Sequence, residues 1–324
     1  GDSAGRNFDA GASNIAIGES SLRTAGTKNF NVAIGAQTGV AMTTGTQNIL
    51  MGYAAGDALT SGGNNIAIGR DTLGAEDTGS RSIGIGDNAL LNQNNDAQNN
   101  NIAIGFYAAR VLTTGQKNVL IGNNAGDSLT TGAENVAIGH EALSTEDARG
   151  GNVAVGYQAL KVLNAGSDAY NTAIGYQSGV AMTTGVENVL IGHDAGKSIT
   201  GGNYNVCIGE GAGDALNTGS TNIAIGFGSL SSEDGGSTNI AMGYNALATL
   251  NTGDSYNIAI GWGAGLSATT GHENVFIGRG AGQSITTGSD SVALGHFALK
   301  TEDAHGKNVA VGYEALTTQN AGTD

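Results

Sequence analysis

The stretch NVAVGYQAL occupies Asn152–Leu160, and NTAIGYQSG follows it at Asn171–Gly179. Both begin with Asn, pass through a short apolar segment to Gly, and continue with Tyr-Gln. The pattern extends along the chain, because the Gly after each apolar segment recurs every 17 residues, apart from two gaps of 19 and one of 18. These glycines are Gly18, Gly35, Gly52, Gly69, Gly86, Gly105, Gly122, Gly139, Gly156, Gly175, Gly192, Gly209, Gly226, Gly243, Gly261, Gly278, Gly295 and Gly312. A fixed period of this kind indicates repeats stacked on one another.

The array predicts one domain over residues 1–324, with a partial coil at 1–13 and 18 full coils at 14–324. No linker or change of composition interrupts it. The chain begins in the middle of a repeat and carries no polar cap, although repeat arrays normally need capping ends. We therefore expect a slice of a longer fibre, continued end to end.

Composition excludes several classes of protein. The chain has 56 Gly but no Gly at every third position, no Pro, and enough Ile, Val and Leu to form a core, so it is neither collagen nor a disordered tail. No apolar run approaches the length that inserts into a membrane. The net charge of −15 argues against nucleic acid as a partner, because phosphates would be repelled.

Each repeat follows one template when it is numbered from its leading Asn. Positions 2 to 4 are apolar, position 5 is Gly, positions 6 and 7 vary, position 8 is small, position 9 is Leu or Gly, and a polar stretch ends in Gly near position 15. A short β-favouring segment bounded by Gly predicts a strand. Two Gly turns per repeat let the chain return once per coil, which predicts an all-β parallel β-solenoid with coils of about 17 residues.

The apolar segment also suggests which side chains face inward. Side chains alternate along a strand, so positions 2 and 4 share one face and position 3 takes the other. We assign Val153 and Val155 to the interior and Ala154 to the exterior. A strand that is apolar on both faces is buried on both faces, so a second copy of the chain is expected to cover position 3. The predicted interface comprises Ala154, Ala173, Leu190, Cys207 and Phe276.

A longer rhythm groups the repeats in blocks of four, with one block of five. Where position 9 is Gly or Ala, a large residue usually stands at position 12, as with Gly39 and Met42. Another repeat of each block reads AG at positions 8 and 9 and carries Leu or Phe at position 3. Other repeats place Leu at position 9. We interpret this as volume compensation in a close-packed interior.

Several polar features resemble sites but have simpler explanations. The Asn at position 1 predicts a ladder of paired amides from coil to coil. The acidic pair Glu76-Asp77 recurs at positions 12 and 13 of later blocks and predicts a solvated turn, with a calcium site shared between chains as the alternative. His140, His193 and His296 all stand at position 6, where only a three-fold axis could gather them around a metal. We therefore predict no metal site and no cofactor.

A resemblance adds to this reasoning. The NVAIG phrase at Asn31–Gly35, followed by a small residue and a later Gly turn, resembles the head repeats of trimeric autotransporter adhesins. The GYNALATLNTG stretch at Gly243–Gly253 is similar to repeats of bacteriophage tail-fibre proteins. The repeats are longer here than in the usual adhesin head. The resemblance implies a left-handed β-roll, a homotrimer, and a location on a virion tail or a bacterial cell surface.

Position 6 is the predicted binding surface. It holds half of the chain's Phe, Trp and Tyr residues, which stacking would align into a ridge. The candidate contacts with a cell-surface receptor or glycan are Tyr157, Tyr176, Phe227, Tyr244, Trp262 and Tyr313. Packing of the turn against a neighbouring coil or chain is the alternative explanation.

These observations together predict an extracellular, non-enzymatic fibre segment that presents a receptor-binding region. No Ser-His-Asp, Cys-His or HExxH arrangement stands out. Two alternatives remain. A polysaccharide-cleaving tailspike would need two carboxylates about 5 to 10 Å apart in one groove, and an ice-binding solenoid would need a flat row of Thr, of which the TTG turns supply only a part.

Overall fold

The computed structural model describes residues 2–6, 11–24, 26–146, 148–166, 168–301 and 306–318. These residues form 18 three-residue strands and no helix, which confirms the parallel β-solenoid. The chain divides into two compact units, Gly1–Gln158 with Gly166–Asp168 and Ala159–Ala165 with Ala169–Asp324. That these units continue one array stays a prediction, as does the handedness of the coil.

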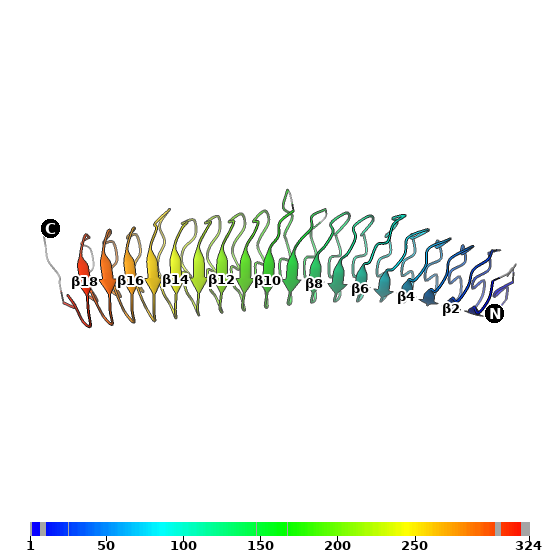
Figure 1. Ribbon diagram of the computed structural model, residues 1–324, viewed down its shortest axis with the longest axis horizontal. Helices are drawn as coiled ribbons and strands as arrows, with labels where there is room; N and C mark the ends of the chain where they lie inside the picture. Colours follow the sequence, from blue (N-terminus) through cyan, green and yellow to red (C-terminus); the bar gives the residue numbers. More distant parts are fainter. Residues whose placement is uncertain are drawn as a thin grey trace. The chain divides into compact units, whose positions relative to one another are not determined.

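Each unit contains nine strands, with one strand in each coil (Figure 1). The first unit contains β1 (Ile15–Ile17), β2 (Val32–Ile34), β3 (Ile49–Met51), β4 (Ile66–Ile68), β5 (Ile83–Ile85), β6 (Ile102–Ile104), β7 (Val119–Ile121), β8 (Val136–Ile138) and β9 (Val153–Val155). The second contains β10 (Thr172–Ile174), β11 (Val189–Ile191), β12 (Val206–Ile208), β13 (Ile223–Ile225), β14 (Ile240–Met242), β15 (Ile258–Ile260), β16 (Val275–Ile277), β17 (Val292–Leu294) and β18 (Val309–Val311).

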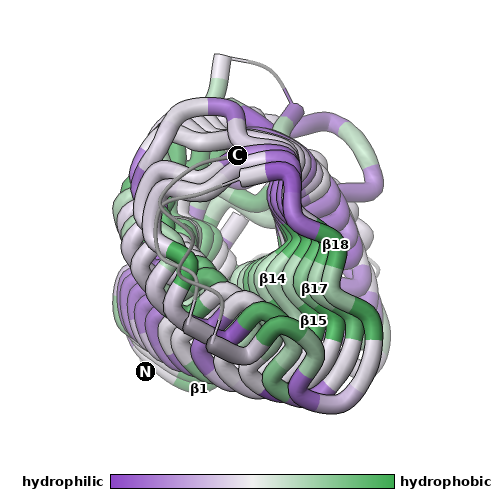
Figure 2. Tube along the Cα trace, turned by 90° about the vertical axis from the view of Figure 1, so that its left-hand side faces the viewer, coloured by the Kyte–Doolittle hydropathy of each residue, from purple (hydrophilic) through white to green (hydrophobic). Residues whose placement is uncertain are grey.

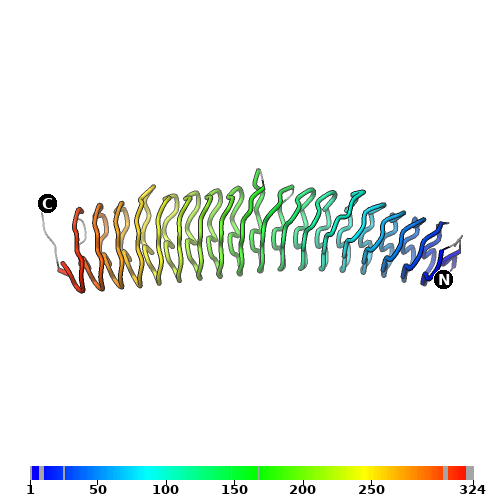
Figure 3. Tube along the Cα trace, in the orientation of Figure 1, coloured from blue at the N-terminus to red at the C-terminus, as the bar shows by residue number. Residues whose placement is uncertain are grey.

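Strands of successive coils pair in parallel and in register within each unit, so equal positions of the repeat stack in rows. Val136 of β8 pairs with Val153 of β9, and Val189 of β11 pairs with Val206 of β12. Within each unit, the trace in Figure 3 shows each coil following the last in sequence order. A residue type that recurs at one position therefore forms a continuous row along a unit.

Glycine at position 5 permits this close stacking. Gly139 adopts a φ of 140°, which L side chains rarely adopt. A Cβ added there would lie 2.2 Å from the carbonyl oxygen of Gly156 in the next coil. The turn after each strand therefore requires Gly for its backbone conformation and for the space it leaves.

The inward and outward faces are the reverse of those that the sequence suggested. Position 3 points into the coil, and Ala154, Ala173, Leu190, Cys207 and Phe276 are all fully buried within a single chain. Positions 2 and 4 point outward and are half-buried or exposed in every strand, as in β9 and β10. The predicted interface through position 3 is wrong, because those side chains cannot reach another chain unless the coil opens.

The interior explains why position 3 is usually Ala. Where it is larger, glycines at position 9 make the space: a Cβ on either Gly39 or Gly56 would lie 3.0 Å from a methyl group of Leu50. Phe276 fills the same role between Gly265 and Gly282. Volume compensation is confirmed, and it acts between position 9 and position 3 as well as position 12. Figure 2 shows the strand wall as a mainly hydrophobic band, labelled at β14, β15 and β17.

The Asn row is confirmed as an internal ladder. Asn118 is fully buried, and its Oδ1 accepts a hydrogen bond from the backbone N–H of Asn135 in the next coil at 2.9 Å. Its Nδ2 donates to the carbonyl oxygen of Gly132 across the same coil, also at 2.9 Å. Each Asn thus links the strand to the far turn of its own coil and to the following coil.

Candidate binding ridge

The aromatic residues at position 6 lie on the surface. Their exposed fractions range from 41% for Tyr157 to 73% for Tyr313. The other predicted contacts, which are also exposed, are Tyr176, Phe227, Tyr244 and Trp262. Each follows the Gly turn that ends a strand, so the row runs beside the outward face of the sheet.

The rings of the second unit stack on one another. The ring centres of Phe227 and Tyr244 are 5.1 Å apart, those of Tyr244 and Trp262 are 6.0 Å apart, and the planes in each pair lie within 9° of parallel. The guanidinium carbon of Arg279 lies 5.3 Å from the Trp262 ring centre. We call Phe227, Tyr244, Trp262 and Arg279 the ring stack. The stack holds each side chain by its neighbours while leaving part of each ring open to solvent.

The three histidines of position 6 join the same row. His140 stacks on Tyr157 with 5.5 Å between ring centres, and His296 stacks on Tyr313 at 5.2 Å. His193 stacks on Tyr176 at 5.1 Å. Across the described part of the chain, no group of three or more His, Cys, Asp or Glu side chains is placed to hold a metal ion. Within one chain, these imidazoles therefore extend the row of stacked rings.

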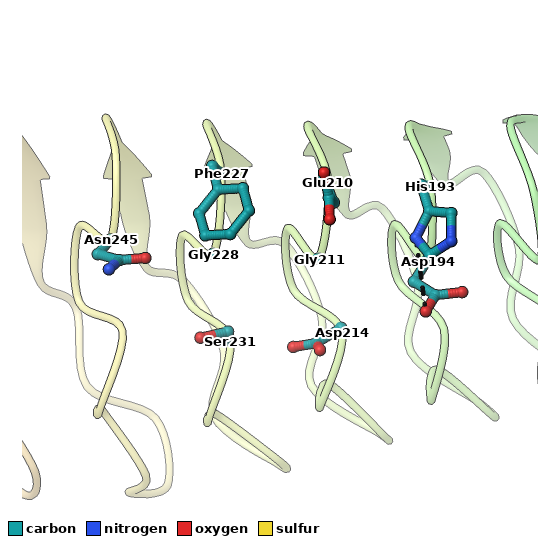
Figure 4. Close-up of a pocket in the computed structure, with 9 residues that line it drawn as sticks. All are labelled: His193, Asp194, Glu210, Gly211, Asp214, Phe227, Gly228, Ser231 and Asn245. Atoms are coloured by element: carbon teal, nitrogen blue, oxygen red, sulfur yellow. Dashed lines mark ion pairs between the residues drawn. The ribbon is translucent and has the colours of Figure 1, made fainter.

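A hollow of about 330 Å³ opens beside the ring stack (Figure 4). Gly211 and Gly228 leave its floor without side chains, and the Phe227 ring forms part of its wall. Carboxylates also line it, and burial is the main cause that raises the pKa of Asp214. Carboxylate oxygens accept hydrogen bonds from hydroxyl groups, so the hollow suits a ligand rich in hydroxyls.

The outward face also carries scattered aromatic residues that the sequence reasoning missed. They stand at the last position of their repeats, directly before the next Asn, and are Phe30, Tyr170, Tyr204 and Tyr256, all exposed. The Ile and Val side chains of positions 2 and 4 lie between this last position and position 6. The signal was the alternation itself, because the last position and positions 2 and 4 alternate with the buried positions 1 and 3.

The acidic pairs form only part of the solvated turn that was expected, because Asp234 is exposed whereas the Glu before it is buried. Glu76 and Glu233 are fully buried at position 12, where other repeats carry Leu or Met. Oε1 of Glu76 accepts from the backbone N–H of Gly79 at 2.7 Å, and Gln93 and Asn99 donate to Oε2, both at 2.9 Å. Burial raises the pKa of both Glu side chains. The counterparts Asp147, Glu302 and Asp303 lie outside the described residues.

Cys207 is an interior residue. Its side chain is fully buried, and burial raises the pKa of its thiol to about 12, with the charge of Asp214 as the smaller cause. A thiol with a raised pKa and no access to solvent is unreactive at neutral pH. Cys207 therefore contributes packing volume at position 3.

Comparisons with known proteins assign no family. The sequence matches no protein-family model, and no curated protein matches it. None of the described residues lies in a helix long and apolar enough to span a bilayer.

Proposed function

We propose that this chain is a non-enzymatic structural and adhesive fibre segment of a phage tail fibre or bacterial surface adhesin. The observation that carries the proposal is the exposed ring stack, held in register by a solenoid in which each coil templates the next. Rigid aromatic faces bind partners at low entropic cost. The segment would be extracellular, would extend the fibre, and would present this surface to a host receptor or glycan.

The test of the adhesive role removes the Trp262 side chain, which is exposed and does not pack in the interior of the coil. We expect Trp262→Ala to reduce attachment of the purified protein to host cells by at least about tenfold, because a large central contact is lost. Thermal melting should change little. Tyr53→Ala is the matched control, since Tyr53 occupies position 6 of an early coil outside the ring stack. Normal attachment of Trp262→Ala would refute the proposal.

Assembly as a homotrimer is the second part of the proposal. The interface is placed on the face of positions 2 and 4, opposite the position 3 face that the sequence suggested. Exposed aliphatic side chains line this face in each unit, represented by Ile138 in the first and Ile174 in the second, and large contiguous apolar patches mark interaction surfaces. The resemblance to trimeric adhesin heads supports three copies rather than two.

Variants on the two faces of the strand test which face the proposed trimer covers. Ile138→Glu with Ile174→Glu should dissociate the trimer while the coils stay folded. Ala154→Glu should instead disrupt the coil, because Ala154 has no exposed surface. Sedimentation and circular dichroism separate these results, and a soluble monomer for the unmodified chain would show that no trimer forms.

A further inference from the structure

Three surface cations, Arg70, Arg110 and Lys117, pair with a carboxylate at the same position of the next repeat. Arg70 donates to Asp87 at 2.8 Å along position 6, and Arg110 donates to Asp127 at 2.9 Å along position 10. The stacking of equal positions explains the pattern, because a residue's nearest neighbour along the row is its counterpart one coil away. The charge of each of these cations is thus balanced locally, on a chain whose net charge is −15.

Arg279 and Lys300 depart from this pattern. Arg279 is exposed at position 6, and its neighbours along the row are Trp262 and His296. Its guanidinium carbon lies 5.6 Å from the centre of the Phe297 ring, and Nζ of Lys300 lies 4.1 Å from the same centre. Among the described residues, no carboxylate forms an ion pair with either cation.

The surrounding aromatic rings hold this charge in place. The Phe297 ring lies over the backbone of Gly280, where an added Cβ would be 2.4 Å from its nearest atoms. The ring centre of His296 is 4.2 Å from that of Phe297. We call Trp262, Arg279, His296, Phe297 and Lys300 the cationic patch. Its cations contact aromatic faces, which stabilise them without neutralising their charge.

The chemistry of the cationic patch defines its ligand. A guanidinium presents a planar fork of donors that matches a carboxylate in a bidentate geometry. The half-exposed Trp262 beside it offers an apolar face to a flat ring. The net negative charge of the chain disfavours anions over most of the surface, whereas at this patch two cations without an ion pair among the described residues share the Phe297 ring and favour one.

We propose that the cationic patch binds a carboxylate-bearing sugar residue of a glycan, with the carboxylate on Arg279 and the sugar ring against Trp262. Lys300 adds positive potential at the same place. The inference rests on the proposed function, since it takes the ring stack as the glycan contact and names the class of glycan.

The experiment measures binding of the full chain to two acidic probes, trigalacturonate and sialyllactose, and to their neutral matches, methyl-esterified trigalacturonate and lactose. We expect at least one acid to bind about tenfold or more tightly than its neutral match, with the difference decreasing at high salt. Arg279→Gln should abolish that preference. Arg70→Gln is the matched control, because Arg70 has the same position but is already paired with Asp87.

Each other outcome overturns one of the two proposals. Equal binding of acid and neutral probes, binding of neither acid, or an unchanged preference in Arg279→Gln would overturn the acidic-sugar assignment. That failure leaves the adhesive role standing if Trp262→Ala still loses cell attachment. If Trp262→Ala attaches normally while Arg279→Gln loses the acid preference, the adhesive role fails and the anion site stands.

Discussion

Replacing Asn118 by Ala tests whether the buried Asn ladder holds successive coils together. The Asn118 side chain accepts from the backbone N–H of Asn135 and donates to the carbonyl oxygen of Gly132. Alanine leaves both buried groups without a partner, and each such group costs about 1–3 kcal/mol. The expected loss is about 3 kcal/mol, which raises the opening equilibrium of this coil about a hundredfold.

Amide hydrogen exchange at Asn135 measures this loss directly, because its N–H donates to the deleted oxygen. In Asn118→Ala the exchange should accelerate about a hundredfold at Asn135 and less in distant coils, since each repeat contacts mainly its neighbours. Asn92→Ala is the control, because Asn92 is exposed at position 11. Unchanged protection at Asn135 would show that the ladder does not stabilise the stack.

Two natural exceptions, Ser82 and Ser291, sharpen this prediction. Ser82 replaces Asn at position 1, and the amide of Gln93 at position 12 takes over part of its contacts. Gln93 Nε2 donates to Ser82 Oγ at 2.8 Å, and Gln93 Oε1 accepts from Asn101 at 2.8 Å. Ser291 Oγ accepts from the backbone N–H of Asn308 at 3.2 Å, so a Ser at position 1 keeps the bond to the next coil. The coil of Asn118 carries Leu129 at position 12, which offers no amide to the carbonyl oxygen of Gly132. Asn118→Ser should therefore destabilise the coil, but less than Asn118→Ala.

Two further predictions concern the buried acid and the Gly turn. Burial raises the pKa of Glu233 above its ordinary value of 4.5, so the folded state binds the proton more tightly and loses stability as pH rises from about 4.5 through the raised pKa. Glu233→Gln should flatten this fall in melting temperature, and an unaltered pH profile would contradict it. Gly139→Ala should destabilise the fold by at least about 2 kcal/mol, because of its φ of 140° and the carbonyl oxygen 2.2 Å from the new Cβ. Gly166→Ala, where an added Cβ meets nothing within 4 Å, should melt like the unmodified chain.

The period, the strand and the Asn ladder could be predicted because each depends on one position of the repeat. Gly at position 5 ends a β-branched segment in every repeat, and this fixes both the strand and its spacing. The conformation of that turn admits no other residue, so Gly recurs at position 5 even where the other positions of the repeat vary. Asn at position 1 recurs for the same reason, since its side chain bridges its own coil and the next.

The acidic pairs and the cationic patch could not be predicted in the same way, because they depend on contacts between positions. Glu76 was expected in a solvated turn from its charge alone, yet position 12 holds Leu or Met in other repeats and therefore faces the interior. Arg279 lies against Trp262 because equal positions stack, and against Phe297 because Gly280 leaves room for that ring. Neither neighbour lies adjacent to Arg279 in the sequence.

The sequence does indicate which face of the strand points into the coil, but only when two positions of the repeat are compared. Alternation places positions 2 and 4 opposite position 3 without saying which face is inside, and all three are apolar. The decisive signal is that Leu50 at position 3 coincides with Gly at position 9 in its own and the preceding repeat, and Phe276 does the same. Only a residue inside the coil needs such space from the opposite wall.

Because positions 2 and 4 face outward, the proposed trimer interface and the proposed glycan contact at Trp262 lie close together on the surface. In the proposed trimer, a second and third copy would cover the aliphatic rows of positions 2 and 4, and the position 6 row borders these rows on one side. A partner that covers the aliphatic rows must therefore stop short of Trp262 if that ring is to bind a glycan. The half-exposed ring stack lies on the turn after the strand, where the chain leaves the plane of the sheet at Gly261. With this placement at the edge of the sheet, both proposals can hold for the same coil, since the proposed trimer interface and the proposed glycan contact occupy different surfaces.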